Sequence, residues 1–375
     1  MRLLDWVALA AVWWRGGGRR AIGRWLLDPG GAGCAGGGRP GALEEVLDRL
    51  GLAGEEGAGA AALRRTAGRA LDRAREGGVT PVPWSDPRYP TALAVIADPP
   101  PVLWLRGDPA ALSALSVALV GSRAGSPYAR EVAYELGSRL GERGVSVVSG
   151  LARGVDAAAH RGALAVAGRT VAVLGSGVDI VYPPEHRALA AQVAERGALV
   201  SELLPGTPPR AAHFPLRNRL ISGLSQAVVV VEAARRSGSL ITARLALEQG
   251  REVMAVPGSI LGGRNRGAHA LLKDGAKVVE DVDDILEELR VPSPAALAAG
   301  GGSPTDPLLR RLEVGESYDF DRLMALSGLD GPRLLARLLE FELSGQVVRG
   351  DGGRFVRCGP GGPDPHETAR HGRGC

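Results

Sequence analysis

Between residues 117 and 289 the chain repeats one pattern: a short apolar run rich in β-branched residues, then Gly and Ser, then an Ala-rich stretch with helical spacing. The apolar runs are continuous rather than alternating, which is typical of parallel strands that helices cover on both faces. The pattern therefore predicts an α/β fold with an extended, Rossmann-like, doubly wound parallel sheet. The expected strands are residues 117–120, 145–149, 170–174, 198–202, 227–231 and 252–256, with 277–279 as a candidate seventh.

The helices expected between these strands, and closing the domain, are residues 128–143, 156–166, 184–196, 216–224, 239–249 and 282–289. Upstream, Pro-punctuated extended segments from residue 79 to 108 are expected to pack at the edge of this core, which we place at residues 79–290. Residues 1–78 are predicted to be a small helical region, partly disordered at its Gly-rich gaps, with its clearest helix at 61–76.

A second compact unit is predicted near the C-terminus. The Pro, Ala and Gly content of residues 291–304 indicates a linker. Residues 305–357 then combine helices at 306–312, 321–326 and 333–343 with a hairpin at 346–357, which is the pattern of a winged helix-turn-helix. Residues 358–375 are expected to be a disordered tail.

The formal net charge of +4 is compatible with an anionic partner, but 43 of the 45 basic residues are Arg throughout the chain, which a general composition bias explains equally well. The three Cys residues, at 34, 358 and 375, are too scattered for a disulfide framework or a zinc site, so we expect no metal and a reducing, cytoplasmic setting. The apolar stretch at residues 3–14 is too short to span a bilayer, so no membrane association is expected.

Small residues and Arg follow the predicted strands. Ligands of open parallel sheets bind beyond the carboxyl ends of the strands, where glycines admit an anion to backbone N–H groups and Arg can contact phosphate. Any one of these glycines can equally be no more than a tight turn. The candidate phosphate-contacting residues are Gly121, Ser122, Arg123, Arg153, Ser237, Gly238 and Ser239.

The segment at residues 213–225 combines one of only four Phe residues with two Arg around an Asn. Phe214 can stack on any base, Arg217 and Arg219 can hold phosphates, and Asn218 can bond a base edge. The alternatives are a core contact for Phe214 and solvent-facing charges for the two Arg. Upstream, Asp156 is interpreted as a helix N-cap and His160 as a packed helix residue rather than a catalyst.

Several motifs of catalysis are missing from the sequence. Neither Lys follows a Gly, so there is no Gly-Lys-Ser/Thr phosphate loop, and an ATPase or kinase of that kind is excluded. His-Glu-x-x-His, Gly-x-Ser-x-Gly and Cys-x-x-Cys do not occur, and Gly175-Ser-Gly177 is only a truncated dinucleotide fingerprint. No cofactor is required by any motif.

Taken in order, the motifs Val120-Gly-Ser-Arg123, Ser149-Gly-Leu-Ala-Arg-Gly-Val-Asp156, Gly175-Ser-Gly-Val-Asp179 with Tyr182-Pro183, Phe214-Pro-Leu-Arg-Asn-Arg219, Ser237-Gly-Ser-Leu-Ile-Thr242 and Val256-Pro-Gly258 resemble the DNA-processing protein A family, also called DprA or Smf. The resemblance covers residues 79–289. It implies a dimeric protein that binds single-stranded DNA without sequence preference and helps load the RecA recombinase during natural transformation.

The resemblance also implies site residues. Arg123 and the segment 214–219 match positions where the family contacts DNA, with Gly121, Ser122 and residues 237–239 lining the same pocket. Family members often carry a Lys shortly before the Phe, whereas here only Arg210 stands nearby as a substitute.

Our first hypothesis is therefore a non-enzymatic, single-stranded DNA-binding recombination mediator. The alternative is a nucleotide-binding enzyme of the phosphoribohydrolase type on a related scaffold, for which Glu248 is the first available acid after the Ser237 loop. A third hypothesis is a transcription regulator that binds duplex DNA through the winged helix, with Arg333 and Arg337 on its last helix and Arg349 or Arg354 on the wing.

Overall fold

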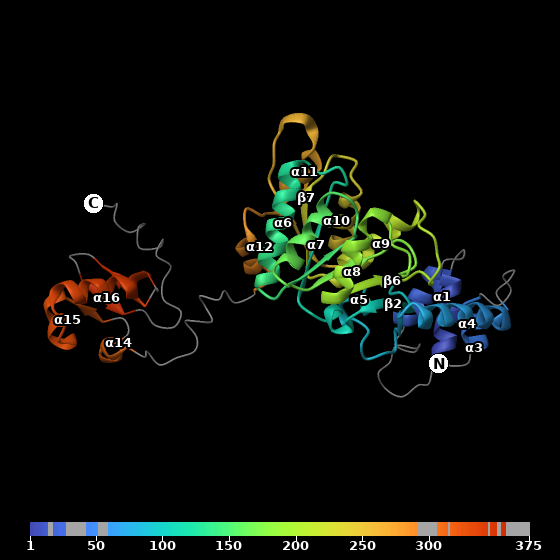
Figure 1. Cartoon of the computed structure of the whole chain (residues 1–375), viewed down its shortest axis with the longest axis horizontal. Helices are drawn as coiled ribbons and strands as arrows, with labels where there is room; N and C mark the ends of the chain where they lie inside the picture. Colours follow the sequence, from blue (N-terminus) through green and yellow to red (C-terminus); the bar gives the residue numbers. More distant parts are fainter. Residues whose placement is uncertain are drawn as a thin grey trace. The chain divides into compact units, whose positions relative to one another are not determined.

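The structure is a computed structural model that describes residues 1–13, 18–27, 43–51, 59–290, 306–313, 316–343, 346–350 and 354–357. The chain divides into two compact units, Met1–Leu289 and Arg290–Cys375, each of which is described by itself (Figure 1). The predicted linker at 291–304, the predicted tail at 358–375 and all three Cys residues lie outside the described residues.

The first unit is built on a nine-stranded sheet in the order β1-β2-β6-β5-β4-β3-β7-β8-β9. Every neighbouring pair from β6 to β9 is parallel. The predicted doubly wound parallel sheet is therefore confirmed, and all seven expected strands are present. They are β3 (Ser116–Gly121), β4 (Ser146–Ser149), β5 (Thr170–Val173), β6 (Ala198–Ser201), β7 (Ala227–Glu232), β8 (Glu252–Ala255) and β9 (Lys277–Val278).

The Pro-rich segments upstream form the antiparallel edge of this sheet. β2 (Val102–Gly107) pairs with β6, and β1 (Thr80–Pro83) pairs with β2 in the register Thr80 to Leu105. Proline lacks the N–H that an interior strand donates on both sides, so Pro81 and Pro83 fit only an outermost strand. The expected packing at the edge of the core takes the form of two added strands.

Helices cover both faces of the sheet. On one face, α7 (Val155–Ala165) and α8 (Arg187–Arg196) share a hydrophobic core with the inward residues of β2, β5 and β6. On the other face, α5 (Thr91–Ala94), α9 (His213–Leu224), α10 (Ser239–Glu248) and α11 (Arg266–Lys273) do the same. α6 (Pro127–Glu142) packs on α7, and α12 (Val282–Glu288) closes the unit. The sequence pattern did not predict the short helix α11.

Four N-terminal helices belong to the same unit: α1 (Leu3–Trp13), α2 (Gly18–Leu27), α3 (Leu43–Arg49) and α4 (Ala60–Glu76). Their apolar side chains, including Trp6 and Trp13, join the core that also contains Trp104 of β2 and Leu174 after β5. α1 has eight buried residues because α2, α3, α4 and the sheet edge surround it. None of the helices in the described ranges is long and apolar enough to cross a membrane.

The order of the strands creates one switch point. The chain runs outward from β3 through β4 and β5 to β6, and then returns to the other side of β3 to form β7. Loops that leave β3 and β7 at their carboxyl ends therefore diverge and leave a crevice between them, which is where open α/β sheets bind ligands.

The second unit is a winged helix. Its described helices are α14 (Pro307–Arg311), α15 (Phe320–Ser327) and α16 (Gly331–Leu343), and β11 (Val347–Arg349) with β12 (Phe355–Arg357) forms the predicted hairpin. A strand that the sequence pattern did not predict, β10 (Ser317–Tyr318), pairs with β12. Leu323, Leu338 and Phe355 are buried in its apolar core.

Candidate nucleic-acid interface

A pocket of about 560 Å³ opens at the switch point of the sheet. It lies between the loop after β3, the loop after β4, the N-terminal turn of α9 and the N-terminal turn of α10. Eight of the predicted site residues line it: Gly121, Arg123, Phe214, Arg217, Asn218, Ser237, Gly238 and Ser239. Residues separated by more than a hundred positions in the sequence thus meet at one crevice, as expected for this topology.

One wall of the pocket carries a cation above an aromatic ring that in turn contacts a second ring. The Arg123 guanidinium lies 5.2 Å from the centroid of the Phe214 ring, and the Phe214 and Tyr182 ring centroids are 5.5 Å apart with an interplanar angle of 46°. Phe214 packs directly on Gly175, where an added Cβ would lie 2.9 Å from the ring. Arg123 is exposed and Phe214 half-buried, so both offer surface to a ligand that stacks and carries negative charge.

The floor of the pocket holds a buried cation beside a buried carboxyl. Arg217 is 4% exposed, and its Nη1 donates to the carbonyls of Gly150, at 2.9 Å, and Val173. Burial lowers the pKa of Arg217 to about 10, so it stays charged near neutral pH. Burial raises the pKa of the Asp156 carboxyl, while Arg217 and backbone N–H groups oppose that rise. Arg217 is therefore a fixed cation that lines the same pocket as the aromatic wall.

The opposite wall is the start of α10. Ser239 is the first residue of that helix, and its Oγ lies 2.6 Å from Ser237 Oγ. Asn218 Nδ2 donates to the Gly238 carbonyl at 3.3 Å, which ties α9 to this turn. Hydroxyls at the positive end of a helix dipole favour an anion.

Three predicted residues lie beside the pocket rather than in it. Arg153 borders a small adjoining recess of about 30 Å³ and forms an ion pair with Glu185. Ser122 donates its backbone N–H to the Glu232 carbonyl at 2.9 Å. Arg210 is exposed, and its neighbours Pro209 and Ala211 line the pocket instead.

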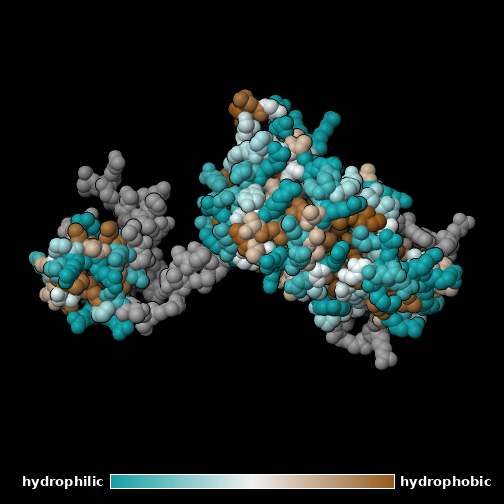
Figure 2. Space-filling model, viewed as in Figure 1, coloured by the Kyte–Doolittle hydropathy of each residue, from teal (hydrophilic) through white to brown (hydrophobic). Residues whose placement is uncertain are grey.

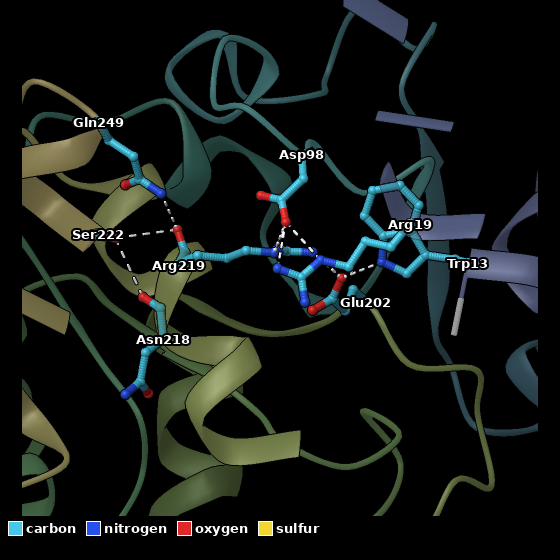
Figure 3. A network of polar contacts seen from close by, with 8 residues as sticks. All are labelled: Trp13, Arg19, Asp98, Glu202, Asn218, Arg219, Ser222 and Gln249. Carbon is cyan, nitrogen blue, oxygen red and sulfur yellow. Dashed lines mark hydrogen bonds and ion pairs between the residues drawn. The ribbon is translucent and has the colours of Figure 1, made fainter. Parts of the chain in front are cut away.

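Arg219 differs from the expectation of a phosphate contact, because it is 2% exposed and is not among the residues that line the pocket. Its side chain leaves α9 in a different direction from that of Asn218 (Figure 3). Its guanidinium pairs with Glu202 and, at 3.2 Å, with Asp98. Trp13 Nε1 of α1 donates to the same Glu202 carboxylate at 2.9 Å, and the Trp13 ring lies 5.7 Å from the guanidinium. The alternative of solvent-facing charges is also wrong for both Arg217 and Arg219, since both are buried.

Two interpretations from the sequence are settled by the hydrogen bonds. His160 is a fully buried helix residue, as predicted, with Nδ1 2.7 Å from Thr170 Oγ1. Asp156 is not an N-cap: it lies in the first turn of α7, and its carboxylate accepts from the N–H groups of Gly150 at 3.1 Å and Ala152 at 3.3 Å. It therefore shapes the loop that Arg217 also bonds.

The sequence reasoning missed Tyr182 as a site residue. Tyr182 is 40% exposed and lines the pocket, and its ring lies against Phe214. The Tyr-Pro pair was visible in the sequence, but only the tertiary contact with α9 reveals its place. Glu248, the acid considered for a hydrolase, stands at the far end of α10 and pairs with Arg244 instead of lining the pocket. Across the described parts of the chain, no three His, Cys, Asp or Glu side chains are grouped to hold a metal ion.

The sequence is similar to proteins of one family over most of its length. Residues 80–290 match the family model described as DNA recombination-mediator protein A, and residues 291–353 match that of the DprA winged helix domain. Protein Smf of Escherichia coli is 42% identical over 287 residues, covering 74% of this chain and 76% of that protein. The DNA processing protein DprA of Bacillus subtilis is 43% identical over 222 residues, covering 59% and 75%.

Two solved structures are similar to the model. DNA processing protein A from Streptococcus pneumoniae superposes with a TM-score of 0.63 at 33% identity, covering 77% of this chain and 99% of that one. DNA processing protein A from Helicobacter pylori, whose structure was described for its unique single-stranded DNA binding mode, superposes with a TM-score of 0.52 at 28% identity, covering 56% and 95%.

Proposed function

Because the chain belongs to the DNA recombination-mediator protein A family, we propose that its pocket at the switch point binds single-stranded DNA and that this binding serves recombination. The observation that carries the proposal is the cation–aromatic wall of Arg123, Phe214 and Tyr182 in the same pocket as the buried Arg217. Such a wall stacks any base and holds the phosphate beside it, which suits binding without sequence preference.

The side chains of the pocket favour binding of a DNA strand over catalysis on a nucleotide substrate. Among the described residues, the one acidic side chain that lines the pocket is Asp156, which is buried and already bonded to two backbone N–H groups. A hydrolase needs an acid or base that is free to exchange a proton with the substrate, and Asp156 is 7% exposed, with its carboxylate occupied by backbone N–H groups. We therefore propose that the protein binds and delivers DNA without chemical change to it.

We further propose where the protein acts and with which partners. A mediator in the cytoplasm that coats an incoming strand would pass that strand to RecA during natural transformation, acting as a homodimer. Light scattering of the full chain tests the dimer. Assembly of RecA on oligo-dT already coated by a single-strand binding protein tests the loading step, and no acceleration on adding this protein would contradict it.

The experiment that tests the site is fluorescence anisotropy of labelled oligo-dT across a salt series. Phosphate contacts release counterions, so affinity should fall as salt rises, with a slope that decreases by about 0.7 when one contact is removed. We expect Arg123→Ala to weaken binding and to lower that slope. Phe214→Ala should weaken binding by about 1–3 kcal/mol through lost stacking and leave the slope unchanged.

Arg196→Ala is the matched control. Arg196 is exposed at the C-terminal end of α8, directly before β6 begins. It therefore lies at the amino ends of the parallel strands, whereas the pocket lies at their carboxyl ends. Its loss should change neither affinity nor slope. Equal affinities of wild type, Arg123→Ala and Phe214→Ala for oligo-dT, or a preference for duplex DNA, would overturn the proposal.

A further inference from the structure

A second pocket, of about 550 Å³, opens on the same edge of the sheet. It lies at the carboxyl ends of β7 and β8, and the β3–α6 loop borders both pockets. Gly121 and Arg123 of that loop line the first pocket, whereas Ser126 and then Tyr128 of α6 line the second. A DNA strand bound at Arg123 would therefore have to pass only a few residues of this loop to reach the second pocket.

The walls of the second pocket are apolar and open. Tyr128 is 53% exposed, and its hydroxyl donates to the Pro257 carbonyl at 3.2 Å, which holds the ring in place. Leu261 also lines this pocket and is 76% exposed. Figure 2 shows hydrophobic surface at the tip of the loop that precedes α11, where Ile260 and Leu261 lie. Solvent-exposed apolar groups around a cavity indicate a ligand with an apolar face.

The floor of the second pocket includes two buried hydrogen-bond acceptors. Asn265 is 4% exposed, and its Oδ1 is buried with no hydrogen-bond partner among the described residues. Glu232 is 3% exposed and accepts from the Ser126 N–H at 3.1 Å through Oε1. A buried acceptor without a partner costs free energy unless a ligand supplies a donor.

Gly258 is the residue that allows Asn265 to reach the floor of the second pocket. A Cβ at this position would lie 1.4 Å from Asn265 Nδ2, so only glycine admits the amide to the floor of the pocket. The Gly258 carbonyl is in turn held by His269 Nε2 at 3.0 Å.

These features select the class of ligand. The Glu232 carboxylate and the unpartnered amide oxygen disfavour a phosphate at the floor and favour an N–H donor. A flat ring with an N–H edge, able to lie against Tyr128 while its edge faces Asn265, is a nucleobase. At the rim of the second pocket, the exposed Arg264 donates to the Ala124 carbonyl at 3.0 Å. Arg264 therefore contacts the loop between the two pockets, where it could bind a phosphate of the DNA backbone.

We propose that this second pocket is a subsite for another nucleobase of the same bound strand, with its ring against Tyr128 and its N–H edge on Asn265 and Glu232. The proposal rests on the proposed function, because it needs a strand in the first pocket. It makes the binding site at least two bases long and places the β3–α6 loop at its centre.

Photo-crosslinking of the full chain tests the proposal directly. Oligo-dT with 5-iodouracil in place of thymine is irradiated with the protein, and crosslinked tryptic peptides are identified by mass spectrometry. We expect one crosslink in residues 211–217, which contain Phe214, and a second in residues 124–130, which contain Tyr128 as their only aromatic residue. A crosslink in the first peptide without the second would overturn the second subsite and leave the proposed function standing.

Affinity provides an independent readout. Tyr128→Ala removes an exposed ring and should weaken oligo-dT binding on the order of tenfold, by the usual worth of stacking one base. Tyr128→Phe keeps the ring and should stay within about twofold of wild type. Equal affinities of wild type and Tyr128→Ala would contradict the proposal.

The N–H edge has its own test. Oligo-dT methylated at thymine N3 keeps the rings and loses the ring donor. Methylation should cost the wild type more affinity than it costs Tyr128→Ala, because that variant no longer holds a base over Asn265. An equal cost in both proteins would overturn the polar part of the proposal. If wild type and Phe214→Ala both failed to bind oligo-dT, the proposed function and the second subsite would fall together.

Discussion

At the scale of the residue, glycines at the strand ends decide how closely functional side chains can approach the backbone. Gly150 is the clearest case, because a Cβ there would lie 2.6 Å from both terminal nitrogens of Arg217. We expect Gly150→Ala to displace this guanidinium, to lower the free energy of unfolding by about 1–3 kcal/mol as overpacking does, and to weaken oligo-dT binding. Urea unfolding and anisotropy measure the two effects.

Gly68→Ala is the control for that substitution. Gly68 lies inside α4 with open space where its Cβ would be, so Ala should be neutral or stabilise the helix by about 0.5–1 kcal/mol. A Gly150→Ala protein with wild-type stability and wild-type affinity would show that Arg217 needs neither of its backbone partners.

His160 makes stability depend on pH. Thr170 Oγ1 donates to the Val147 carbonyl at 2.8 Å, so the hydrogen-bond network assigns the His160 proton to Nδ1. His160 Nε2 is then buried and has no hydrogen-bond partner in the part of the chain that the structure describes. Burial, with help from the charges of His186, Arg217 and Arg161, lowers the pKa of His160 to about 3.

The folded pKa lies below the ordinary value of 6.5, so the unfolded chain takes up the proton first as pH falls. The stability that neutral His160 contributes is therefore present above about pH 6.5 and is lost progressively toward pH 3. We expect a loss of about 2 kcal/mol between pH 7 and pH 5, measured by urea unfolding. His160→Gln should remove this part of the pH dependence, and an unchanged profile in that variant would contradict the assignment.

At the scale of the element, α9 has two polar faces with different tasks. Asn218 and Arg219 are adjacent, yet Figure 3 shows their side chains leaving the helix in different directions. Asn218 lines the pocket, whereas Arg219 reaches Glu202 and Asp98 beneath the N-terminal helices. Removing one partner of a buried ion pair leaves an uncompensated charge, which costs about 3–5 kcal/mol.

We therefore expect Arg219→Leu to lower the free energy of unfolding by that amount and Asn218→Ala to leave it nearly unchanged. Asn218→Ala should instead weaken oligo-dT binding at a temperature where both proteins are folded. The double variant Arg219→Leu with Glu202→Leu should recover part of the lost stability, because no buried charge is left unpaired. Additive losses in the double variant would contradict this interpretation of the network.

At the scale of the whole molecule, the pocket belongs entirely to one unit. Every residue that lines it lies within Met1–Leu289, which has its own hydrophobic cores on both faces of the sheet. In the winged helix, Arg337 is held by Asp306 at 2.7 Å and by Glu340 at 2.6 Å, so this candidate for duplex contact already has partners.

We expect a chain that ends at residue 290 to bind oligo-dT within about threefold of the full chain, measured by anisotropy under the same salt conditions. Circular dichroism and a urea transition confirm that the shortened chain is folded. A loss of affinity above tenfold in a folded protein would assign part of the strand contact to the winged helix.

The sequence by itself determined the order and type of the elements of the core. Continuous apolar runs between Ala-rich stretches have one stable arrangement, a parallel sheet covered on both faces, and carboxyl-end loops of such a sheet must meet at one edge. For that reason Arg123 and Ser239 could be assigned to one edge of the sheet before any coordinate was known, whereas Phe214 was joined to them through the resemblance to a known family.

Only the tertiary structure decided which way each side chain of α9 points and what surrounds it. Periodicity places Arg217 and Arg219 near each other along the helix, but whether an Arg faces a ligand, a carbonyl or a buried carboxylate depends on elements far away in the sequence. Trp13 and Glu202, 189 positions apart, withdraw Arg219 from the pocket, while Tyr182 reaches Phe214 from another loop. Such contacts follow from the packing of distant segments, which no local pattern encodes.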